Sequence, residues 1–525
     1  MADFTFAELT PTAFLRRSAT VHAERDAVVD GDLRLTYREL YDRCRRLTGV
    51  LAGLGVEPGD RVAVLATNSH VLLEMHHAVP MRGAVLVPLN IRLSLEELTY
   101  VVEHSGSTVL VSGEEHAEAA AEVARRTGVR HLGAGPDGDY ERLLAAAEPA
   151  EVACADERGL LGINYTSGTT GRPKGVMTHH RGAYLQSLSL LVHGRMDAST
   201  AYLWTVPMFH CNGWCLTWGV TAVGGLHVCL RKIDPERIWT LLRDEGVTHF
   251  SAAPTVLTMI ADAEAAASPP LERRVAVQTG GSPPSPTLLA RMDRLGMDVT
   301  HLYGLTETFG PIGINEEQPH WADLDAEALA AVKARQGVAN VIAEPLRVVD
   351  LDGVDVPADG ATPGEIVARG NDVMLGYYRD EEATAAVDLG GWFRTGDLAV
   401  MHPDGWIEIT DRAKDVIITG GENVASVEVE RVIDAHPDVV ESAVVGRPDE
   451  RWGEVPVAFV TLREGRELTA EQVADHVRAH LAGFKVPRVV HFRTLPKTST
   501  GKIQKQVLRR HAGDAGDRAD PGAGG

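Results

Sequence analysis

The sequence predicts an α/β fold with a large N-terminal domain of parallel-rich sheets covered by helices, a β-rich subdomain, and a small α+β C-terminal domain. The chain has 525 residues, more than a single hydrophobic core usually supports. Strand-like and helix-like segments alternate up to about residue 340, which is typical of parallel sheets covered by helices. Short strands with Gly, Asp and Pro turns then dominate. From Lys414 the order becomes strand, helix, strand, strand, helix, strand.

The strands of the large domain are apolar runs bounded by turn residues. Ahead of one helical segment, Ser94 and Glu97 form the pattern of a capping box. The apolar residues that follow at helical spacing, among them Leu98 and Val102, would face a sheet. These strands are predicted at 61–68, 84–90, 107–113, 248–254 and 274–281.

The later segments predict the smaller parts of the protein. Three short strands at 346–350, 364–370 and 406–410 indicate the β-rich subdomain. The α+β unit after them spans about 100 residues, a common domain size. Its predicted pieces are the strands 415–421, 439–446, 455–462 and 489–495, a helix at 426–436, and a second helix capped by Thr469 and Gln472.

We therefore expect an N-terminal domain at 1–413, a C-terminal domain at 414–512 and a tail at 513–525. The tail lacks the residues that form a core, so we expect it to be disordered.

Composition limits the classes of partner and compartment. The formal net charge of −22 argues against nucleic acid as the main partner, because phosphate backbones need Lys/Arg surfaces. No stretch approaches the roughly 20 apolar residues of a membrane helix, and the first ten residues lack a signal-peptide pattern. The five cysteines are not spaced as a disulfide framework. We therefore expect a cytoplasmic protein without a transmembrane segment.

The segment YTSGTTGRPKG, residues 165–175, has the chemistry of a phosphate-binding loop. It follows an apolar strand, and glycines let the backbone N–H groups bend around phosphates while Thr, Ser and Lys side chains add donors. A kinase or ATPase P-loop does not fit. Only two residues separate Gly171 from Lys174, and Gly175 stands where a Ser or Thr would bind magnesium. The alternative to phosphate binding is a flexible surface loop.

Three further segments carry groups suited to a nucleotide. LYGLTET (302–308) offers the face of Tyr303 for stacking on a base and the Glu307 carboxylate for Mg²⁺. In the segment 392–415, Asp397 could accept both hydroxyls of a ribose. PKTSTGKIQK (496–505) places Lys502 on a polar loop. Taken singly, Asp397 could equally be a turn residue and Lys502 a solvated surface charge.

Together these four segments resemble the adenylate-forming superfamily, which includes acyl-CoA synthetases, nonribosomal adenylation domains and luciferases. The resemblance runs in the family's order from about residue 10 to about residue 511. It implies that a small-molecule carboxylic acid attacks the α-phosphate of ATP and releases pyrophosphate. A thiol, usually that of CoA, then attacks the acyl adenylate and AMP leaves. ATP, Mg²⁺ and CoA are the implied cofactors and co-substrates.

The resemblance also implies roles for individual residues. Glu307 is the implied Mg²⁺ ligand, Thr306 an α-phosphate contact, and Lys502 the catalytic lysine that bridges the acyl carboxylate and the α-phosphate. The implied β- and γ-phosphate contacts are Thr166, Ser167, Gly168, Thr169, Thr170 and Lys174. The implied adenosine contacts are Gly280, Gly281, Ser282, Tyr303 and Gly304 around adenine, with Asp397 and Arg412 at the ribose.

In the resembled family the small C-terminal domain is mobile, because it swings about a hinge between the two half-reactions. Lys414 matches the hinge. Lys502 withdraws after adenylation, and a face near Gly420, Gly421 and Glu422 then builds the thiol tunnel. Domain interfaces with few, exchangeable contacts permit such motion.

The segment PMFHCNGWCLTWG, residues 207–219, matches the acyl pocket of the family. His210 matches a histidine common among acyl- and aryl-CoA ligases, and we place it with the catalytic residues. The phrases FHCNGW, LRK and PKTSTGKIQK most resemble a branch that contains short- and medium-chain fatty acid, benzoate-type and related CoA ligases. This resemblance implies a short- or medium-chain fatty acid or an aryl acid as substrate. The predicted pocket is apolar and offers no cationic partner for a second carboxylate, so a dicarboxylate is disfavoured. The predicted pocket residues are Phe209, His210, Asn212, Trp214 and Gly304.

Several alternatives stay open. A metal site at His210, Cys211 and Cys215 lacks a second Cys/His pair at zinc spacing. A stand-alone adenylating enzyme that delivers acyl groups to a carrier protein remains the runner-up to a CoA ligase. A kinase, an ATPase and a non-catalytic nucleotide-binding module are further alternatives. The resemblance is also compatible with a homodimer.

Overall fold

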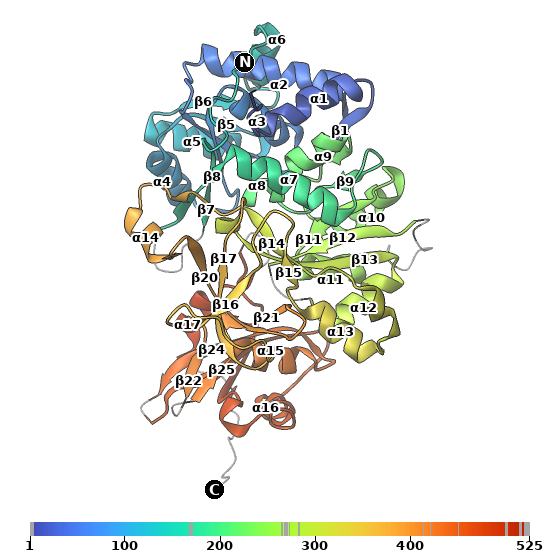
Figure 1. The fold of residues 1–525 in the computed structure, drawn as a ribbon, viewed down its shortest axis with the longest axis vertical. Helices are drawn as coiled ribbons and strands as arrows, with labels where there is room; N and C mark the ends of the chain where they lie inside the picture. The colour runs from blue at the N-terminus through green and yellow to red at the C-terminus, as the bar shows by residue number, and fades with distance from the viewer. Residues whose placement is uncertain are drawn as a thin grey trace. The chain divides into compact units, whose positions relative to one another are not determined.

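In the computed structural model the protein forms two compact units (Figure 1). The first comprises Met1–Pro345 and Ala368–Phe393, and the second Leu346–Val367 and Arg394–Gly525. Each unit is described separately below. The structure describes residues 5–166, 172–263, 266, 271, 273–281, 284–412, 414–419, 422–449, 451–498, 502–513 and 517–518.

One sheet of the first unit has the order β18-β8-β7-β4-β3-β5-β6. Its strands from β7 to β6 are parallel, and β8 and β18 add an antiparallel edge. The predicted strands at 61–68, 84–90 and 107–113 lie here. The strands are β3 (Arg61–Leu65), β4 (Val85–Pro88), β5 (Ser107–Ser112), β6 (Arg130–Gly133), β7 (Leu160–Thr166), β8 (Lys174–His179) and β18 (Gly376–Tyr377).

A second sheet of this unit has the order β15-β14-β13-β12-β11-β9-β10-β1-β2. Its central strands, from β13 to β1, are parallel. The predicted strands at 248–254 and 274–281 belong to it. The strands are β1 (Asp26–Asp30), β2 (Leu33–Thr36), β9 (Ala201–Leu203), β10 (Leu226–Val228), β11 (His249–Ala252), β12 (Val275–Thr279), β13 (Met297–Leu305), β14 (Gly310–Ile314) and β15 (Val338–Ala339).

The two sheets contain the same strand order. In one, the chain runs β3, β4, β5, β6 and the spatial order is β4-β3-β5-β6. In the other, β9, β10, β11 and β12 are arranged as β10-β9-β11-β12. In both sheets the second strand lies on one side of the first strand and the third strand lies on its other side, so the strand order reverses beside β3 and beside β9. Sheets of this kind bind ligands at the carboxyl ends of their strands, so these edges are where functional groups are expected.

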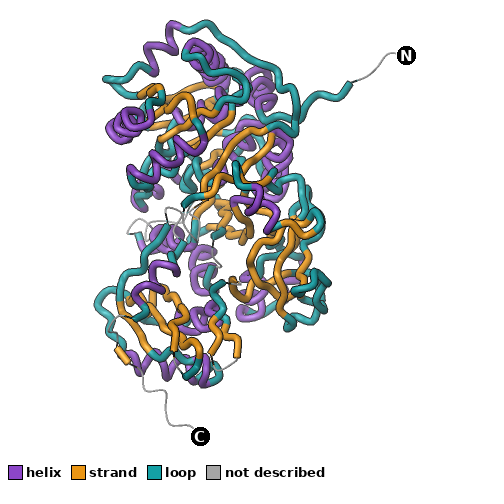
Figure 2. Tube along the Cα trace, turned by 90° about the vertical axis from the view of Figure 1, so that its left-hand side faces the viewer, coloured by secondary structure: helices purple, strands orange, loops and turns teal. Residues whose placement is uncertain are grey.

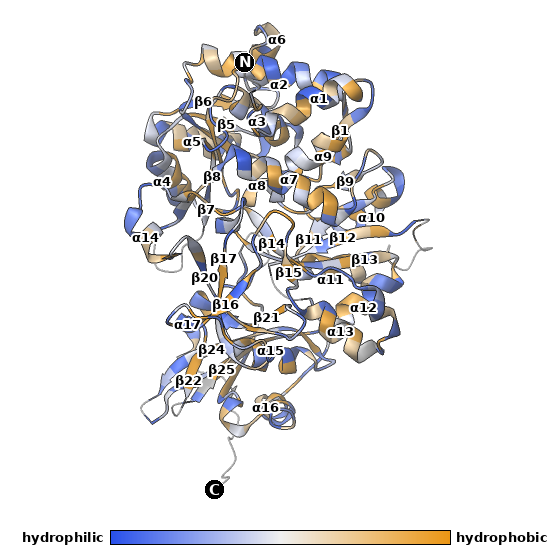
Figure 3. Cartoon of the chain, viewed as in Figure 1, coloured by the Kyte–Doolittle hydropathy of each residue, from blue (hydrophilic) through white to orange (hydrophobic). Residues whose placement is uncertain are grey.

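Helices alternate with the strands along the first unit, and Figure 2 shows helices lying beside the strands of the chain. The predicted capping box is confirmed, since Ser94 accepts a hydrogen bond from the Glu97 N–H and Glu97 from the Ser94 N–H. Helices such as α2 and α12 carry hydrophilic beside hydrophobic stretches (Figure 3). The helices are α1 (Thr12–Val21), α2 (Tyr37–Gly53), α3 (His70–Met81), α4 (Leu95–Ser105), α5 (Ala117–Thr127), α6 (Tyr140–Ala146), α7 (His180–Gly194), α8 (Cys211–Trp214), α9 (Leu216–Val223), α10 (Pro235–Asp244), α11 (Pro254–Asp262), α12 (Pro286–Arg294), α13 (Ala326–Ala334) and α14 (Glu381–Ala386).

The second unit contains the predicted β-rich and α+β segments. Its β-rich part includes β16 (Arg347–Val349), β17 (Pro363–Ala368), β20 (Trp392–Met401) and β21 (Ile407–Arg412), while β19 (Asp388–Leu389) pairs with the first residues of β20. The α+β part contains every predicted strand and helix and adds β23, α17 and β27. Its elements are β22 (Ile417–Thr419), β23 (Glu422–Val424), α15 (Ser426–Asp434), β24 (Val439–Asp449), β25 (Gly453–Leu462), α16 (Ala470–Arg478), β26 (Val489–Phe492), α17 (Lys505–His511) and β27 (Asp517–Arg518).

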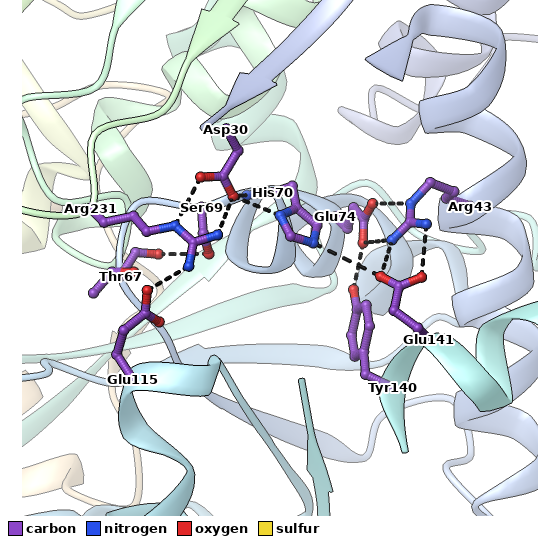
Figure 4. Close-up of polar contacts among 10 residues, drawn as sticks. All are labelled: Asp30, Arg43, Thr67, Ser69, His70, Glu74, Glu115, Tyr140, Glu141 and Arg231. Atoms are coloured by element: carbon purple, nitrogen blue, oxygen red, sulfur yellow. Dashed lines mark hydrogen bonds and ion pairs between the residues drawn. The ribbon is translucent and has the colours of Figure 1, made fainter. Parts of the chain in front are cut away.

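Charged side chains, among them the buried Asp30 and Glu74, surround the first turns of α3 (Figure 4). Asp30 lies 2.7 Å from His70 Nδ1 and 2.9 Å from the Arg231 guanidinium. One turn further along α3, the fully buried Glu74 pairs with Arg43 at 2.5 Å. An adjoining cavity of about 490 Å³ is lined by His70, Arg231 and other residues at the carboxyl ends of β5 and β6, none of them a predicted site residue. Among the described residues, no helix is both long and apolar enough to span a membrane.

Candidate active site

The phosphate-loop segment connects two antiparallel strands of the first unit. Thr166 is the last residue of β7 and Lys174 the first of β8, and the two are paired across the ladder. The Lys174 ammonium lies 4.8 Å from the centre of the Tyr377 ring. The ladder thus brings the two ends of the segment together. The predicted contacts Ser167, Gly168, Thr169 and Thr170 lie outside the described residues.

Tyr377 links Lys174 to Glu307. Tyr377 lies on β18, which pairs with β8, and its hydroxyl donates to Glu307 Oε1 at 2.8 Å. The Met374 N–H also donates to the Glu307 carbonyl at 2.8 Å. Burial, together with the Glu307 carboxylate, raises the pKa of Tyr377, so this phenol stays protonated and remains a donor. Sequence analysis missed Tyr377, and the only available signal was the aromatic pair after Gly376.

Thr306 and His210, predicted from separate motifs, both contact Cys211. The Cys211 sulfur lies 3.6 Å from Thr306 Oγ1 and 3.8 Å from His210 Nε2. Burial raises the pKa of Cys211 to about 12, so the thiol is neutral and serves as a packing group between the two motifs. Among the residues that the structure describes, no cluster of three or more His, Cys, Asp or Glu could hold a metal ion. The alternative zinc site therefore gains no support.

The predicted acyl segment contains an unusual backbone turn. Five consecutive residues, from Cys211 to Cys215, have φ between +42° and +60°. Left-handed backbone costs non-glycine residues roughly 1–2 kcal/mol each, and such strain concentrates at functional sites. Gly213 lies in the middle, where a Cβ would come within 2.7 Å of the Trp204 ring. This conformation was not predicted, because nothing in the sequence marks a left-handed run.

Near this turn, the Trp214 ring and neighbouring backbone lie close to several glycines. A Cβ at Gly280 would lie 3.4 Å from Trp214 and 3.0 Å from the Leu302 carbonyl, and one at Gly304 would overlap the Gly310 carbonyl. These glycines allow the approach of neighbouring backbone and of the Trp214 ring. Gly281 has φ +90° with open space beside it, whereas Ser282 lies outside the described residues.

Three other predicted residues of this region are buried. Tyr303 is 7% exposed, and its ring packs against Gly313. Phe209 is also buried, and its carbonyl accepts a hydrogen bond from Asn164. The Asn212 side chain is fully buried, and its amide oxygen and nitrogen have no hydrogen-bond partner among the described residues. An unpaired buried amide is costly, so this polar group is suited to contact a bound molecule.

The remaining predicted residues lie in the second unit. Asp397 on β20 and Arg412 on β21 are paired across the ladder, with Arg412 Nε 3.1 Å from Asp397 Oδ1. The partly buried Lys502 lies among their charges and those of Lys414 and Asp415. Burial, reinforced by the Arg412 guanidinium, lowers the pKa of Lys502 to about 7. Burial also lowers the pKa of Lys414.

The thiol-side residues are described only in part. Glu422 begins β23 and is exposed, while Gly420 and Gly421 lie outside the described residues. The predicted residues thus collect into two groups. One contains Lys174, Glu307 and Thr306, and the other contains Asp397, Arg412 and Lys502.

Comparison with known proteins identifies the family. Residues 15–378 match the AMP-binding enzyme family, and residues 428–502 match the AMP-binding enzyme C-terminal domain. The chain is 43% identical to the peroxisomal acetate/butyrate–CoA ligase AAE7 of Arabidopsis thaliana, over 97% of this chain and 96% of that protein. It is 39% identical to the peroxisomal trans-cinnamate:CoA ligase of Petunia hybrida, over 97% and 94% of the two chains. The crystal structure of ATP-bound MatB from Rhodopseudomonas palustris is similar, with a TM-score of 0.85, 30% identity, and 97% and 99% of the chains covered. The protein therefore belongs to the family of AMP-binding enzymes, in its acid–CoA ligase branch.

Proposed function

We propose that this protein is an AMP-forming ligase that joins a short-chain or aryl carboxylic acid to CoA through an acyl adenylate. The observation that carries the proposal is the grouping of the motif residues. Lys174, Tyr377 and Glu307 form one connected set of contacts in the first unit. Asp397, Arg412 and Lys502 form a second set. The acetate/butyrate and cinnamate ligases among its relatives support the range of acids.

In the first half-reaction, a carboxylate oxygen attacks the α-phosphorus of ATP, an O–P bond forms, and pyrophosphate leaves. Negative charge builds up as the two anions meet, so catalysis depends on fixed positive charge and hydrogen-bond donors. We assign Lys174 to the β- and γ-phosphates, Thr306 to the α-phosphate, and Lys502 to the space between carboxylate and α-phosphate. In the second half-reaction, the CoA sulfur attacks the acyl carbon and AMP leaves.

Glu307 is the residue proposed to hold Mg²⁺, which would neutralise phosphate charge when bound. The residues fit, since one carboxylate oxygen accepts from Tyr377 and this hydrogen bond orients the other. Tyr303, Gly280, Gly281 and Ser282 are assigned to adenine. The Asp397 carboxylate, already held by Arg412, is assigned to the ribose hydroxyls.

The acyl pocket is assigned to the left-handed turn and its surroundings, with Phe209, His210, Asn212, Trp214 and Gly304. A rigid, strained turn holds its side chains in fixed directions, which suits the recognition of a small acid. The pocket is expected to offer no cation for a second carboxylate.

The acceptor and the cellular setting complete the proposal. We assign CoA as acceptor, Gly420, Gly421 and Glu422 to its side of the site, and Lys414 to the hinge at the 413/414 domain boundary. Delivery to a carrier protein is the second candidate. A cytoplasmic location and a homodimer are further parts of the proposal, although the two relatives named above are peroxisomal.

The test is a pyrophosphate-release screen over straight-chain acids from acetate to palmitate, with benzoate and cinnamate added. Each active acid is then offered CoA and a holo-carrier protein side by side, and the thioesters are read by mass spectrometry. We expect AMP with pyrophosphate, the highest rates with short acids, and an acyl-CoA product. ADP with phosphate, or acyl transfer to the carrier alone, would overturn the assignment.

The lowered pKa of Lys502 predicts a pH dependence. The ammonium is present below about 7 and is lost as the pH rises through that value. Because kcat/KM reports groups of the free enzyme, kcat/KM for adenylate formation should fall above about pH 7. In Lys502→Arg the guanidinium stays charged, so the variant should be slower and lack this descending limb. A limb that persists unchanged in the variant must come from another group.

A further inference from the structure

We propose that four residues position Lys502: Lys505, Ser426, Glu430 and Asp411. Together they attach the hairpin on which Lys502 lies to the end of strand β21. This inference rests on the role proposed above for Lys502. None of the four residues is a predicted site residue, although Lys505 and Asp411 lie within the motif segments 496–505 and 392–415. None is assigned to contact a substrate.

Lys502 lies on one arm of a hairpin whose described residues are 496–498 and 502–504. Lys497 and Ile503 form an antiparallel bridge, and the Thr498 N–H donates to the Lys502 carbonyl at 2.7 Å. The Lys502 N–H in turn donates to Thr498 Oγ1 at 3.1 Å. The side-chain amide of Gln504 donates to the Lys497 carbonyl at 3.0 Å. These bonds hold the described residues on the two arms of the hairpin together, 496–498 on one arm and 502–504 on the other.

Lys505 fastens this hairpin at the first turn of α17. Its ammonium pairs with Glu430 of α15 at 2.7 Å and donates to Ser426 Oγ at 2.6 Å. Both partners of the ion pair have side chains only 14% exposed. Glu430 also accepts from the Val444 N–H at 2.6 Å, so the carboxylate is held on β24 as well. Such a buried, multiply bonded pair fixes geometry far better than an exposed one.

Ser426 links Lys505 to Asp411 through hydrogen bonds. The Ser426 hydroxyl donates to Asp411 Oδ1 at 2.9 Å, and its N–H donates to Oδ2 of the same carboxylate. Asp411 is almost fully buried on β21 and immediately precedes Arg412, which pairs with Asp397. A chain of hydrogen bonds thus runs from the Lys502 hairpin to the strand end that presents the proposed ribose contacts.

This connection has a consequence for catalysis. A catalytic group must be held within about half an ångström of its productive position by the residues around it. Lys502 has a long, flexible side chain, so its placement depends on the hairpin. Without the Lys505 ammonium, Glu430 and Asp411 would be buried acids lacking their cation, and burial already raises the pKa of both. The hairpin would then no longer be held in one position relative to Arg412.

The test compares Lys505→Met with Lys505→Arg and with Ser426→Ala. Adenylate formation is followed by ATP–pyrophosphate exchange with the best acid of the screen. Thioester formation is followed with pre-made acyl adenylate and CoA. We expect Lys505→Met to slow adenylate formation at least tenfold and thioester formation less than twofold. Lys505→Arg should restore most of the loss, and Ser426→Ala should show a smaller loss of the same kind.

Arg431→Met is the matched control. Arg431 is the neighbour of Glu430 on α15 and pairs with Glu408 of β21 at 2.7 Å, so its loss removes an α15–β21 ion pair without touching the hairpin. Both half-reactions should stay within twofold of the unchanged protein. If Lys505→Met slows both half-reactions equally, or neither, the positioning role is wrong.

A second measurement does not depend on activity. Acetic anhydride labels neutral lysines, and mass spectrometry of the peptide that contains Lys502 gives its labelling against pH. Lys505→Met should shift the midpoint for Lys502 upward, because the loosened hairpin exposes Lys502 to water, while Arg431→Met should not. An unshifted labelling midpoint for Lys502 would refute the positioning role, whether or not the protein forms an adenylate. A wild-type protein that formed no adenylate would refute only the proposed function.

Discussion

Lys502→Ala is expected to lower the rate of adenylate formation from acid and ATP by at least about 100-fold. Removal of one fixed electrostatic donor from a developing anion costs about 10² to 10³ in rate, and alanine leaves no cation at this position. Thioester formation from pre-made adenylate should change less than about threefold, because Lys502 is expected to withdraw from the site before the thiol attacks. Pyrophosphate exchange and CoA-thioester production measure the two steps separately.

The control for this experiment is Lys333→Ala, which removes a lysine from α13 of the first unit, where it lies 3.5 Å from Glu317. Both half-reactions should remain at the level of the unchanged protein. Equal losses of the two steps in Lys502→Ala would show that the lysine supports the fold or both reactions, and would contradict its assignment to adenylation alone.

Replacing Glu74 with alanine is expected to destabilise the protein by about 3–5 kcal/mol. Glu74 is fully buried on α3 and pairs with Arg43 of α2, while the Tyr140 hydroxyl donates to it at 2.6 Å (Figure 4). Without Glu74, the partly buried Arg43 keeps only the exposed Glu141, at 2.6 Å, as a carboxylate partner, and Tyr140 loses its acceptor. Breaking buried ion pairs costs about this much. Urea unfolding, read from the midpoint at an unchanged m-value, measures the difference.

Arg38→Ala, on the helix α2 that also carries Arg43, provides the comparison. Arg38 pairs with Glu24, and the two side chains are 65% and 78% exposed, so less than about 1 kcal/mol should be lost. If Glu74→Ala cost no more than Arg38→Ala, the buried pair would make no special contribution. The double variant Arg43→Met with Glu74→Met should lose less than Glu74→Ala, because it removes both charges of the buried pair.

The sequence by itself determined the elements that depend on neighbouring residues. Ser94 with Glu97 and Thr469 with Gln472 form capping boxes at the helix starts that their spacing predicts. The apolar runs of β3, β4, β5, β11 and β12 are strands, because short apolar segments between turn residues can be buried on both faces of a sheet. The order of the four motifs also indicated the family, which the comparisons confirm.

Only the tertiary structure decided which distant residues meet. Tyr377 reaches Glu307 from 70 positions away, and Lys505 reaches Ser426 from 79 positions away. The left-handed turn from Cys211 to Cys215 is equally invisible in the sequence, because packing around Trp204 and Gly280 holds a backbone that no local preference favours. Local spacing encodes caps and strand periodicity, whereas strand pairing and burial set the partners of a side chain. The residue types of the site could therefore be read from the motifs, but their hydrogen-bonded neighbours could not.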